Sequence, residues 1–131
     1  MNVLILGAGL MQIPAILSAK ELGYRVCLVD ADDKAIAISK ADEFRKIDLK
    51  DKEGILQYAK SLQNGSGLAT VFTAGTDFSA SVSYVCQKLN LPSHTFDAAL
   101  NASIKTRMRK CFSDANVPSP KFFNLNKDNF T

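Results

Sequence analysis

A glycine-containing segment near the start of the chain has the residue types best suited to binding a ligand. It reads Gly7-Ala8-Gly9-Leu10-Met11-Gln12 and directly follows the apolar run 3–6. Glycines let the chain turn sharply and let backbone N–H groups approach an anion, and a helix that starts here adds a partial positive charge. Asp30 closes the next apolar run, 26–29, where a carboxylate can accept a hydrogen bond from a ribose hydroxyl.

One departure separates this pattern from the dinucleotide-binding fingerprint. The third glycine of the fingerprint, which permits close packing of helix on strand, is Gln12 here. The substitution argues against a typical NAD site. Two alternatives stay open, namely an NAD(P)-binding oxidoreductase domain that uses Gly7, Gly9 and Asp30, and a tight turn with no ligand.

A second loop with polar residues follows a later apolar run. The loop is Ala74-Gly75-Thr76-Asp77, and the run before it spans 68–73. Ligands of open α/β folds bind at the carboxyl edge of the sheet, so this loop is a second candidate for the same site. Asp77 could bind a substrate or cap a helix, and capping is favoured when the residue is taken alone.

A basic cluster occupies the last helical pattern of the chain. Its members are Lys105, Arg107, Arg109 and Lys110. A solvated helix face explains Arg109 and Lys110. Lys105 falls in the first turn, where a cation opposes the helix dipole, so its charge favours a functional role.

The histidine and the cysteines do not predict a metal site. His94 is the only histidine, and no partner lies at ligand spacing. Cys27, Cys86 and Cys111 are odd in number and widely spaced, which disfavours a disulfide framework. Each falls in an apolar pattern, so we expect small buried side chains in a reducing cytosol.

Strands alternate with helices along the whole chain. Strands are predicted at 3–6, 26–29, 44–48 and 68–73, with another short strand after Leu91-Pro92 and one at Lys121–Leu125. Helices are predicted after Pro14, at 51–62, around 82–89, at 96–102 and at 104–115. This alternation predicts a doubly wound α/β fold, with a mostly parallel sheet and helices on both faces.

Composition indicates one globular domain and excludes several classes of protein. The chain has 131 residues, 47% hydrophobic and 22% charged, with a net charge of +3. That excess is too small to indicate nucleic-acid binding. Residues 1–19 carry no charged side chain, but Gly7, Gly9, Gln12 and Pro14 interrupt them, so no signal peptide or membrane span is predicted. A cytoplasmic protein is expected.

Several motifs, taken in order, resemble the N-terminal domain of ATP-grasp ligases. They are residues 4–16 (LILGAGLMQIPAI), Val29-Asp30, Ala41-Asp42-Glu43, 89–92 (LNLP), 104–109 (IKTRMR) and 116–121 (NVPSPK). The similarity spans nearly the whole chain. It is greatest to proteins like the carbamoyl phosphate synthase large chain and biotin carboxylase.

The resemblance implies a role for each motif. Residues 1–116 would form the Rossmann-like pre-ATP-grasp domain, and 117–131 the linker and first strand of a following, truncated ATP-grasp domain. The substrate-binding residues would be Gly7, Ala8, Gly9, Leu10, Met11, Gln12, Asp30, Thr76 and Asp77. Lys105 would contact the phosphates of ATP, although Ile104 replaces the acidic or Asn residue that often precedes this lysine.

The resemblance also implies a reaction. The parent enzyme would activate a carboxylate or bicarbonate with ATP and Mg²⁺, and an amine would attack the acyl-phosphate. The chain carries no catalytic residue of its own, so we expect an inactive fragment that binds no cofactor tightly and has neither nucleic acid nor membrane as partner. The resemblance also allows a homodimer, and a small-ligand-binding regulatory module is a further alternative.

Overall fold

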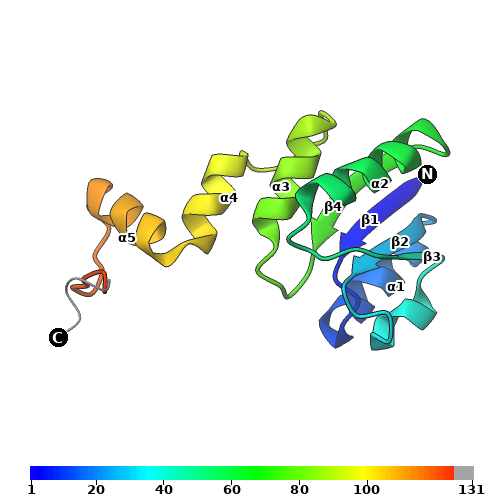
Figure 1. The fold of residues 1–131 in the computed structure, drawn as a ribbon, viewed down its shortest axis with the longest axis horizontal. Helices are drawn as coiled ribbons and strands as arrows, with labels where there is room; N and C mark the ends of the chain where they lie inside the picture. Colours follow the sequence, from blue (N-terminus) through cyan, green and yellow to red (C-terminus); the bar gives the residue numbers. More distant parts are fainter. Residues whose placement is uncertain (126–131) are drawn as a thin grey trace.

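A computed structural model describes residues 1–125 of the chain, and its core is a four-stranded parallel sheet. The strands are β1 (Asn2–Leu6), β2 (Arg25–Asp30), β3 (Glu43–Lys46) and β4 (Leu68–Thr73), in the order β3-β2-β1-β4. The predicted α/β fold with a parallel sheet is confirmed (Figure 1).

Helices and short 3₁₀ turns connect the strands. The 3₁₀ turn η1 (Leu10–Gln12) and α1 (Ile13–Glu21) follow β1, and η2 (Ile36–Lys40) follows β2. The longer helices α2 (Lys52–Asn64) and α3 (Ser79–Lys88) flank β4 in sequence. The last helices are α4 (Phe96–Ser103) and α5 (Lys105–Asp114).

The sheet has an apolar core on each face. Leu4 and Leu6 of β1 pack with side chains of α2 and α3, whereas Val3 and Ile5 pack with α1 and η2. Every residue of β1 is buried, and burial on both faces of the sheet explains the unbroken apolar run 3–6. The carboxyl ends of β1 and β4 meet at one edge of this sandwich, where both candidate loops begin.

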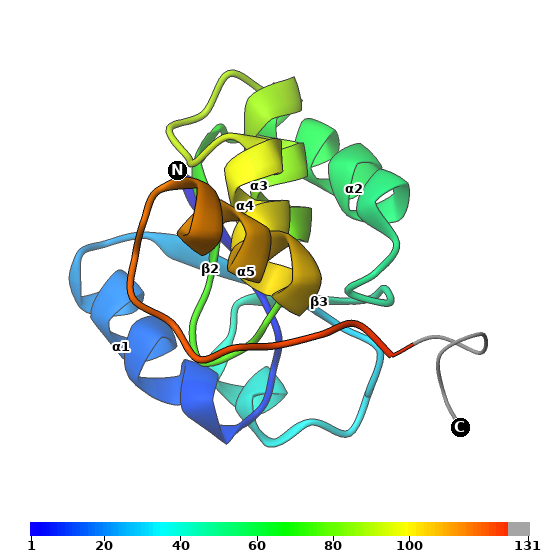
Figure 2. The ribbon, with the colours of Figure 1, turned by 90° about the vertical axis from the view of Figure 1, so that its left-hand side faces the viewer.

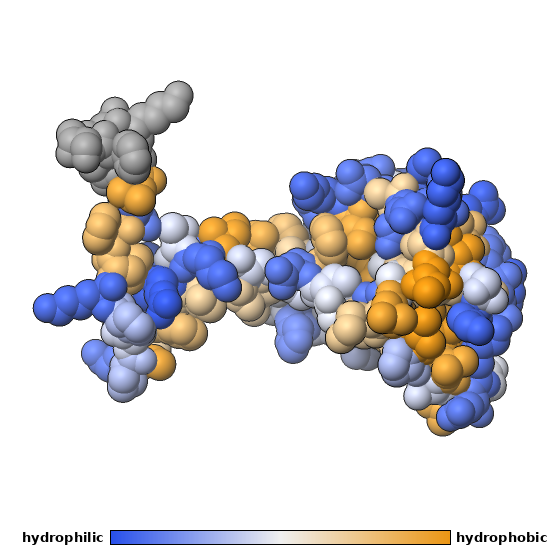
Figure 3. Space-filling view, turned by 90° about the horizontal axis from the view of Figure 1, so that it is seen from below, coloured by the Kyte–Doolittle hydropathy of each residue, from blue (hydrophilic) through white to orange (hydrophobic). Residues whose placement is uncertain are grey.

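The helices α4 and α5 form an arm that projects from the sheet on the side to which the strands' carboxyl ends point (Figure 1). The ring of Phe96 in α4 contacts Tyr84 of α3 edge-on, with centroids 5.6 Å apart. α5 packs chiefly on α4 and buries none of its residues. The apolar stripe predicted on α5 is thus only half-covered, and apolar side chains remain on the surface of the arm (Figure 3).

Two predicted strands do not form. Leu91 packs on the core, but the segment from Leu91 to Thr95 makes no ladder, and residues 121–125 form no strand either. A strand is stable only where a neighbour accepts and donates its backbone hydrogen bonds, and apolar sequence alone does not supply one. The part of the predicted last segment beyond residue 125 lies outside the described residues.

Two of the three cysteines lie in the apolar core on the α2 and α3 side of the sheet. Cys27 and Cys86 are fully buried, whereas Cys111 is partly exposed because α5 buries no side chain. The expectation for Cys111 was therefore wrong. In the region from residue 1 to 125, no helix combines the length and apolar character needed to cross a bilayer.

Candidate functional site

The glycine turn after β1 is held against the end of β2. Gly7 has a φ of +105°, and its N–H donates to the carbonyl of Val29 at 2.8 Å. The next N–H, that of Ala8, donates to Oδ2 of Asp30 at 2.7 Å. Few residues other than glycine adopt such a φ, so the sequence fixes the turn at this position.

Asp30 shapes this turn through both of its carboxylate oxygens. Oδ2 accepts from Ala8, and Oδ1 accepts from the N–H of Asp32 at 3.0 Å. The side chain is only partly buried, so each oxygen keeps room for a further donor. Its observed contacts are with backbone, and its role toward a substrate stays a prediction.

Gln12 takes the place of the third glycine and points inward. It is only 2% exposed, and its Nε2 donates to the carbonyl of Ala74 in the second loop. Its Nε2 lies 2.9 Å from the position that a Cβ on Gly7 would occupy. Gln12 therefore fills the space between the two loops and lies behind the surface to which a substrate would bind.

The second loop lies against the glycine turn, as the sequence predicted. The hydroxyl of Thr73 donates to the carbonyl of Leu6 at 2.7 Å and lies 2.5 Å from the hydroxyl of Thr76. Gly75 has a φ of +67°, and a Cβ there would come within 2.8 Å of Cβ of Met11. The two loops thus form one continuous surface at the carboxyl edge of β1 and β4.

Asp77 does not cap the next helix. The residue at the N-cap of α3 is Phe78, and no side chain caps that helix. Asp77 is exposed, and its carboxylate makes no hydrogen bond or ion pair with residues 1–125. The capping expectation was therefore wrong, and the carboxylate remains available to a ligand.

The exposed part of the two loops combines polar groups with apolar side chains. Leu10 and Met11 are each 66% exposed, while the N–H of Gly9 has no acceptor within the described part of the chain. Thr76 and Asp77 add a hydroxyl and a carboxylate. A backbone donor, a hydroxyl and a carboxylate suit a small polar molecule that carries both an anionic group and an amine.

Two of the four cations of α5 are engaged in ion pairs. Arg107 donates to Asp97 of α4 at 2.6 Å, and Lys110 lies 3.1 Å from Asp114. Arg107 also donates to Asn101 at 2.8 Å and so fixes α5 on α4. These two charges have a structural explanation.

The other two cations, Lys105 and Arg109, are unpaired. Neither forms an ion pair with any residue from 1 to 125, and both line a hollow of about 330 Å³ together with residues 122–125. Lys105 is the first residue of α5, and Ile104 supplies no side-chain cap. Uncapped N–H groups at the start of α5, with two cations lining the same hollow, favour an anion such as a phosphate.

The structure does not bring Lys105 into contact with the two loops. The loops lie at the carboxyl edge of the sheet, whereas α5, which begins at Lys105, lies at the far end of the projecting arm (Figure 1; Figure 2 looks along the arm). The predicted site residues therefore divide into a loop surface (residues 7–12 and 74–77, with Asp30) and a cationic helix end (Lys105 with Arg109).

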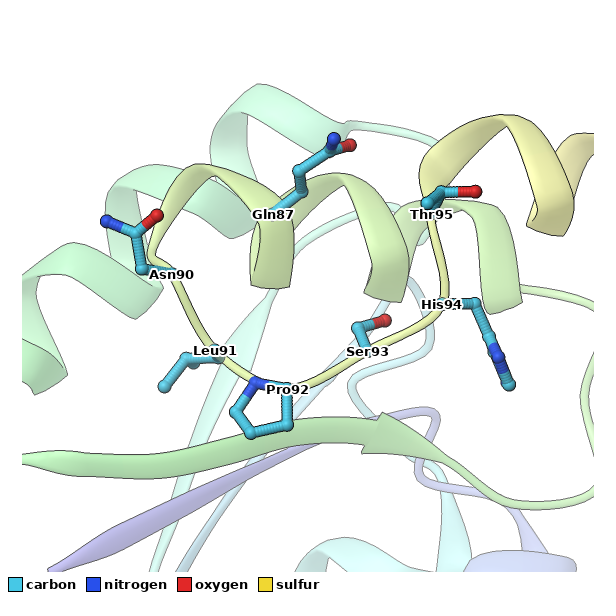
Figure 4. Close-up of a pocket in the computed structure, with 7 residues that line it drawn as sticks. All are labelled: Gln87, Asn90, Leu91, Pro92, Ser93, His94 and Thr95. Atoms are coloured by element: carbon cyan, nitrogen blue, oxygen red, sulfur yellow. The ribbon is translucent and has the colours of Figure 1, made fainter.

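A further hollow of about 440 Å³ lies between α3 and the segment that follows it. Its polar side chains include Gln87, Asn90, His94 and Thr95, which point in different directions (Figure 4). Such divergent groups cannot contact one small ligand together. No three His, Cys, Asp or Glu side chains within residues 1–125 are grouped so that they could hold a metal ion.

Comparisons with known proteins support the predicted resemblance. No protein-family model and no curated protein sequence matches the chain. Among solved structures, phosphoribosylglycinamide synthetase from Anaerococcus prevotii matches 97% of the chain with a TM-score of 0.79 and 26% identity. L-amino acid ligase from Bacillus licheniformis matches 92% (TM-score 0.72, 18% identity). N5-carboxyaminoimidazole synthetase from Staphylococcus aureus, complexed with ADP, matches 88% (TM-score 0.69, 17% identity).

The chain resembles ATP-grasp ligases. The resemblance predicted from the motifs is therefore confirmed at the level of the fold and of the group of neighbours. The chain covers 32%, 30% and 29% of the length of the three structures named above. It thus corresponds to about a third of each.

Sequence reasoning missed the inward direction of Gln12 and the unpaired state of Arg109. The contact of Gln12 joins residues 62 positions apart, and no local pattern reports such a pairing. Arg107 and Lys110 each have an acidic partner on α4 or α5, whereas Arg109 has none among residues 1–125, and this difference depends on how the helices pack.

Proposed function

We propose that the chain is the substrate-side domain of an ATP-dependent carboxylate–amine or bicarbonate-activating ligase. The observation that carries the proposal is the pairing of the two loops at the carboxyl edge of β1 and β4, in a fold shared with several such ligases. Resemblance to the carbamoyl phosphate synthase large chain is part of the same proposal. The domain would be inactive alone.

The proposed reaction has two steps. A carboxylate oxygen attacks the γ-phosphorus of ATP, which releases ADP and leaves an acyl-phosphate. An amine then attacks the acyl carbon and expels phosphate. In this scheme the loop surface holds the acceptor substrate, with the N–H of Gly9, the hydroxyl of Thr76 and the carboxylate of Asp77 as its polar contacts.

The cationic helix end would contribute to ATP binding. Lys105 and Arg109 have no acidic partner among the described residues, and the start of α5 is uncapped, so this end of the helix fits a phosphate group. Mg²⁺ would neutralise phosphate charge in the parent enzyme. The described residues offer no cluster of ligands for it, so its ligands would come from other parts of the enzyme.

One observation argues against the NAD(P) alternative. The side chain of Gln12 occupies the space beside Gly7 that a fingerprint glycine would leave open. Calorimetric titration with NADH and NADPH is the test, and micromolar binding would favour an oxidoreductase domain over the ligase.

The ATP assignment is tested by a matched pair of lysine variants in the parent enzyme. Lys105→Ala should raise the KM for ATP about tenfold or more, the loss expected for one charged phosphate contact. Lys110→Ala is the control, because that lysine lies on the same helix but pairs with Asp114. Equal KM values for ATP in both variants would refute the role of Lys105.

A further inference from the structure

We propose that Gln12 is a latch that positions the loop 74–77 over the glycine turn. In this role it is a positioning residue that sets the places of Thr76 and Asp77 without contacting the substrate itself. The inference rests on the proposed function only where it concerns an acceptor substrate. The latch itself is a property of the chain.

One hydrogen bond and the space beside two glycines place Gln12 between the loops. Its Nε2 donates to the carbonyl of Ala74, which precedes Thr76 by two residues. Its Nε2 and Cδ lie 2.9 and 3.1 Å from the position of a Cβ on Gly7, and its Oε1 lies 3.4 Å from that of a Cβ on Gly9. One side chain therefore packs under both glycines of the turn and holds the start of the second loop.

The primary amide is the group that this position requires. A carbonyl in a partly buried place needs a donor, and an apolar side chain of equal length would leave it unsatisfied. A carboxylate would fit the space but cannot donate, and it would repel the carbonyl oxygen. Neighbouring contacts connect Gln12 to the exposed part of the second loop. Met11 packs on Gly75, and the hydroxyls of Thr73 and Thr76 are in contact.

The decisive variant is Gln12→Glu, with Gln57→Glu as its matched control. The control makes the same chemical change at an exposed position of α2. A buried carboxyl titrates above its ordinary pKa, and only its protonated form donates. The hydrogen bond from residue 12 to the carbonyl of Ala74 should therefore be lost at neutral pH and form again as the introduced carboxyl gains a proton.

The measurement is the amide chemical shift of residues 75–78, from about pH 5 to about pH 8. In Gln12→Glu, these shifts should move away from their wild-type values at the upper end, where the hydrogen bond to Ala74 is lost, and return toward them at the lower end. Wild-type chain and Gln57→Glu should show no such transition. Asp30 and Asp77, the titratable groups on and beside the loops, are present in all three proteins and cancel in the comparison.

A second variant separates the latch from simple packing. Gln12→Met keeps the length of the side chain but has no donor, so the amide chemical shifts of residues 75–78 should differ from the wild type at every pH. If these shifts in Gln12→Met match those of the wild type, or if Gln12→Glu shows no pH-dependent recovery, the latch is refuted.

The effect of Gln12 on substrate binding is measured separately, in the parent ligase. Gln12→Met should raise the KM for the acceptor while the KM for ATP stays unchanged. The same changes in amide chemical shift, in a parent protein that shows no ATP-dependent ligation, would uphold the latch and overturn the proposed function. An unchanged acceptor KM in an active ligase would overturn the positioning role.

Discussion

Gly7 shows how closely the backbone of the glycine turn is specified by one residue. Its φ of +105° strains any other residue, and the Gln12 amide fills the space that a side chain would need. The sequence therefore requires glycine here for two separate reasons. The two reasons can be separated by experiment, because Gly23 has a positive φ but open space at its Cβ position.

Gly7→Ala should lower the free energy of unfolding by about 2 kcal/mol or more, since it combines backbone strain with a clash. Gly23→Ala is the control, because Gly23 has a φ of +81° but no atom within 4 Å of its Cβ position. It should lose only about 1 kcal/mol, from backbone strain alone. Urea unfolding of both variants measures the difference, and equal losses would show that the space beside Gly7 is not filled as described.

For individual residues, the sequence predicted which ones turn the chain but not which ones face a ligand. The glycine turn and the adjacency of Thr76 follow from strand-end positions that any parallel sheet imposes. The inward direction of Gln12 and the uncapped α3 depend on contacts between distant segments. Asp77 was assigned to a cap because that is the commonest role of an aspartate before a helix.

Among the elements, the amino-terminal edge of the sheet is held by a network around β3. Glu43 accepts from the hydroxyl of Tyr58 at 2.8 Å and from Arg25 at 2.8 Å. These two donors lower the pKa of Glu43 below its ordinary value of 4.5. Burial and the same carboxylate raise the pKa of Tyr58. The network ties β2 and β3 to α2, away from the candidate site.

The lowered pKa of Glu43 makes stability depend on pH in a defined direction. The unfolded chain binds this proton more readily than the folded chain, so the contribution is complete above pH 4.5 and is lost as pH falls through the lowered pKa. Glu43→Gln removes the contribution. The difference in unfolding free energy between wild type and variant should therefore shrink below pH 4.5, as measured by urea unfolding. A difference that stays constant with pH would contradict the network.

The elements themselves were the most predictable part of the molecule. The strand predicted at 68–73 has those bounds in the structure, and the buried runs at the start of the chain form β1 and β2. The predictions failed where an apolar segment lacked a pairing partner, at Leu91-Pro92 and at 121–125. Periodicity reports which face of a segment is apolar, whereas a strand also requires a neighbour in the right place.

Across the whole molecule, the sheet body and the α4–α5 arm differ in how firmly they are held. The body contains both apolar cores, while α5 buries nothing and packs chiefly on α4. The sequence did not predict this division, because the stripe on α5 is apolar enough to suggest a core helix. The cationic helix end therefore belongs to the less tightly packed part of the molecule.

Deleting residues 104–131 should leave the body intact. The unfolding free energy of the shortened chain should stay within about 15% of that of the full chain, the usual margin of extrapolation from urea. Deletion from residue 96 onward should cost more, because it also removes the contact of Phe96 with Tyr84. Loss of cooperative unfolding in the first deletion would show that α5 contributes to the core.

In the proposed ligase, the loop surface would bind the acceptor substrate and the cationic helix end would bind ATP. Steady-state kinetics of two variants of the parent enzyme test this assignment most directly. The backbone of Gly9 (φ −78°) is one that any residue adopts, but a Cβ there would lie 3.4 Å from Oε1 of Gln12, so Gly9→Val should disturb the loop surface locally without backbone strain. Gly9→Val should raise the KM for the acceptor about tenfold or more and leave that for ATP unchanged, and Lys105→Ala should do the reverse. Variants that change both KM values alike, or neither, would contradict the account.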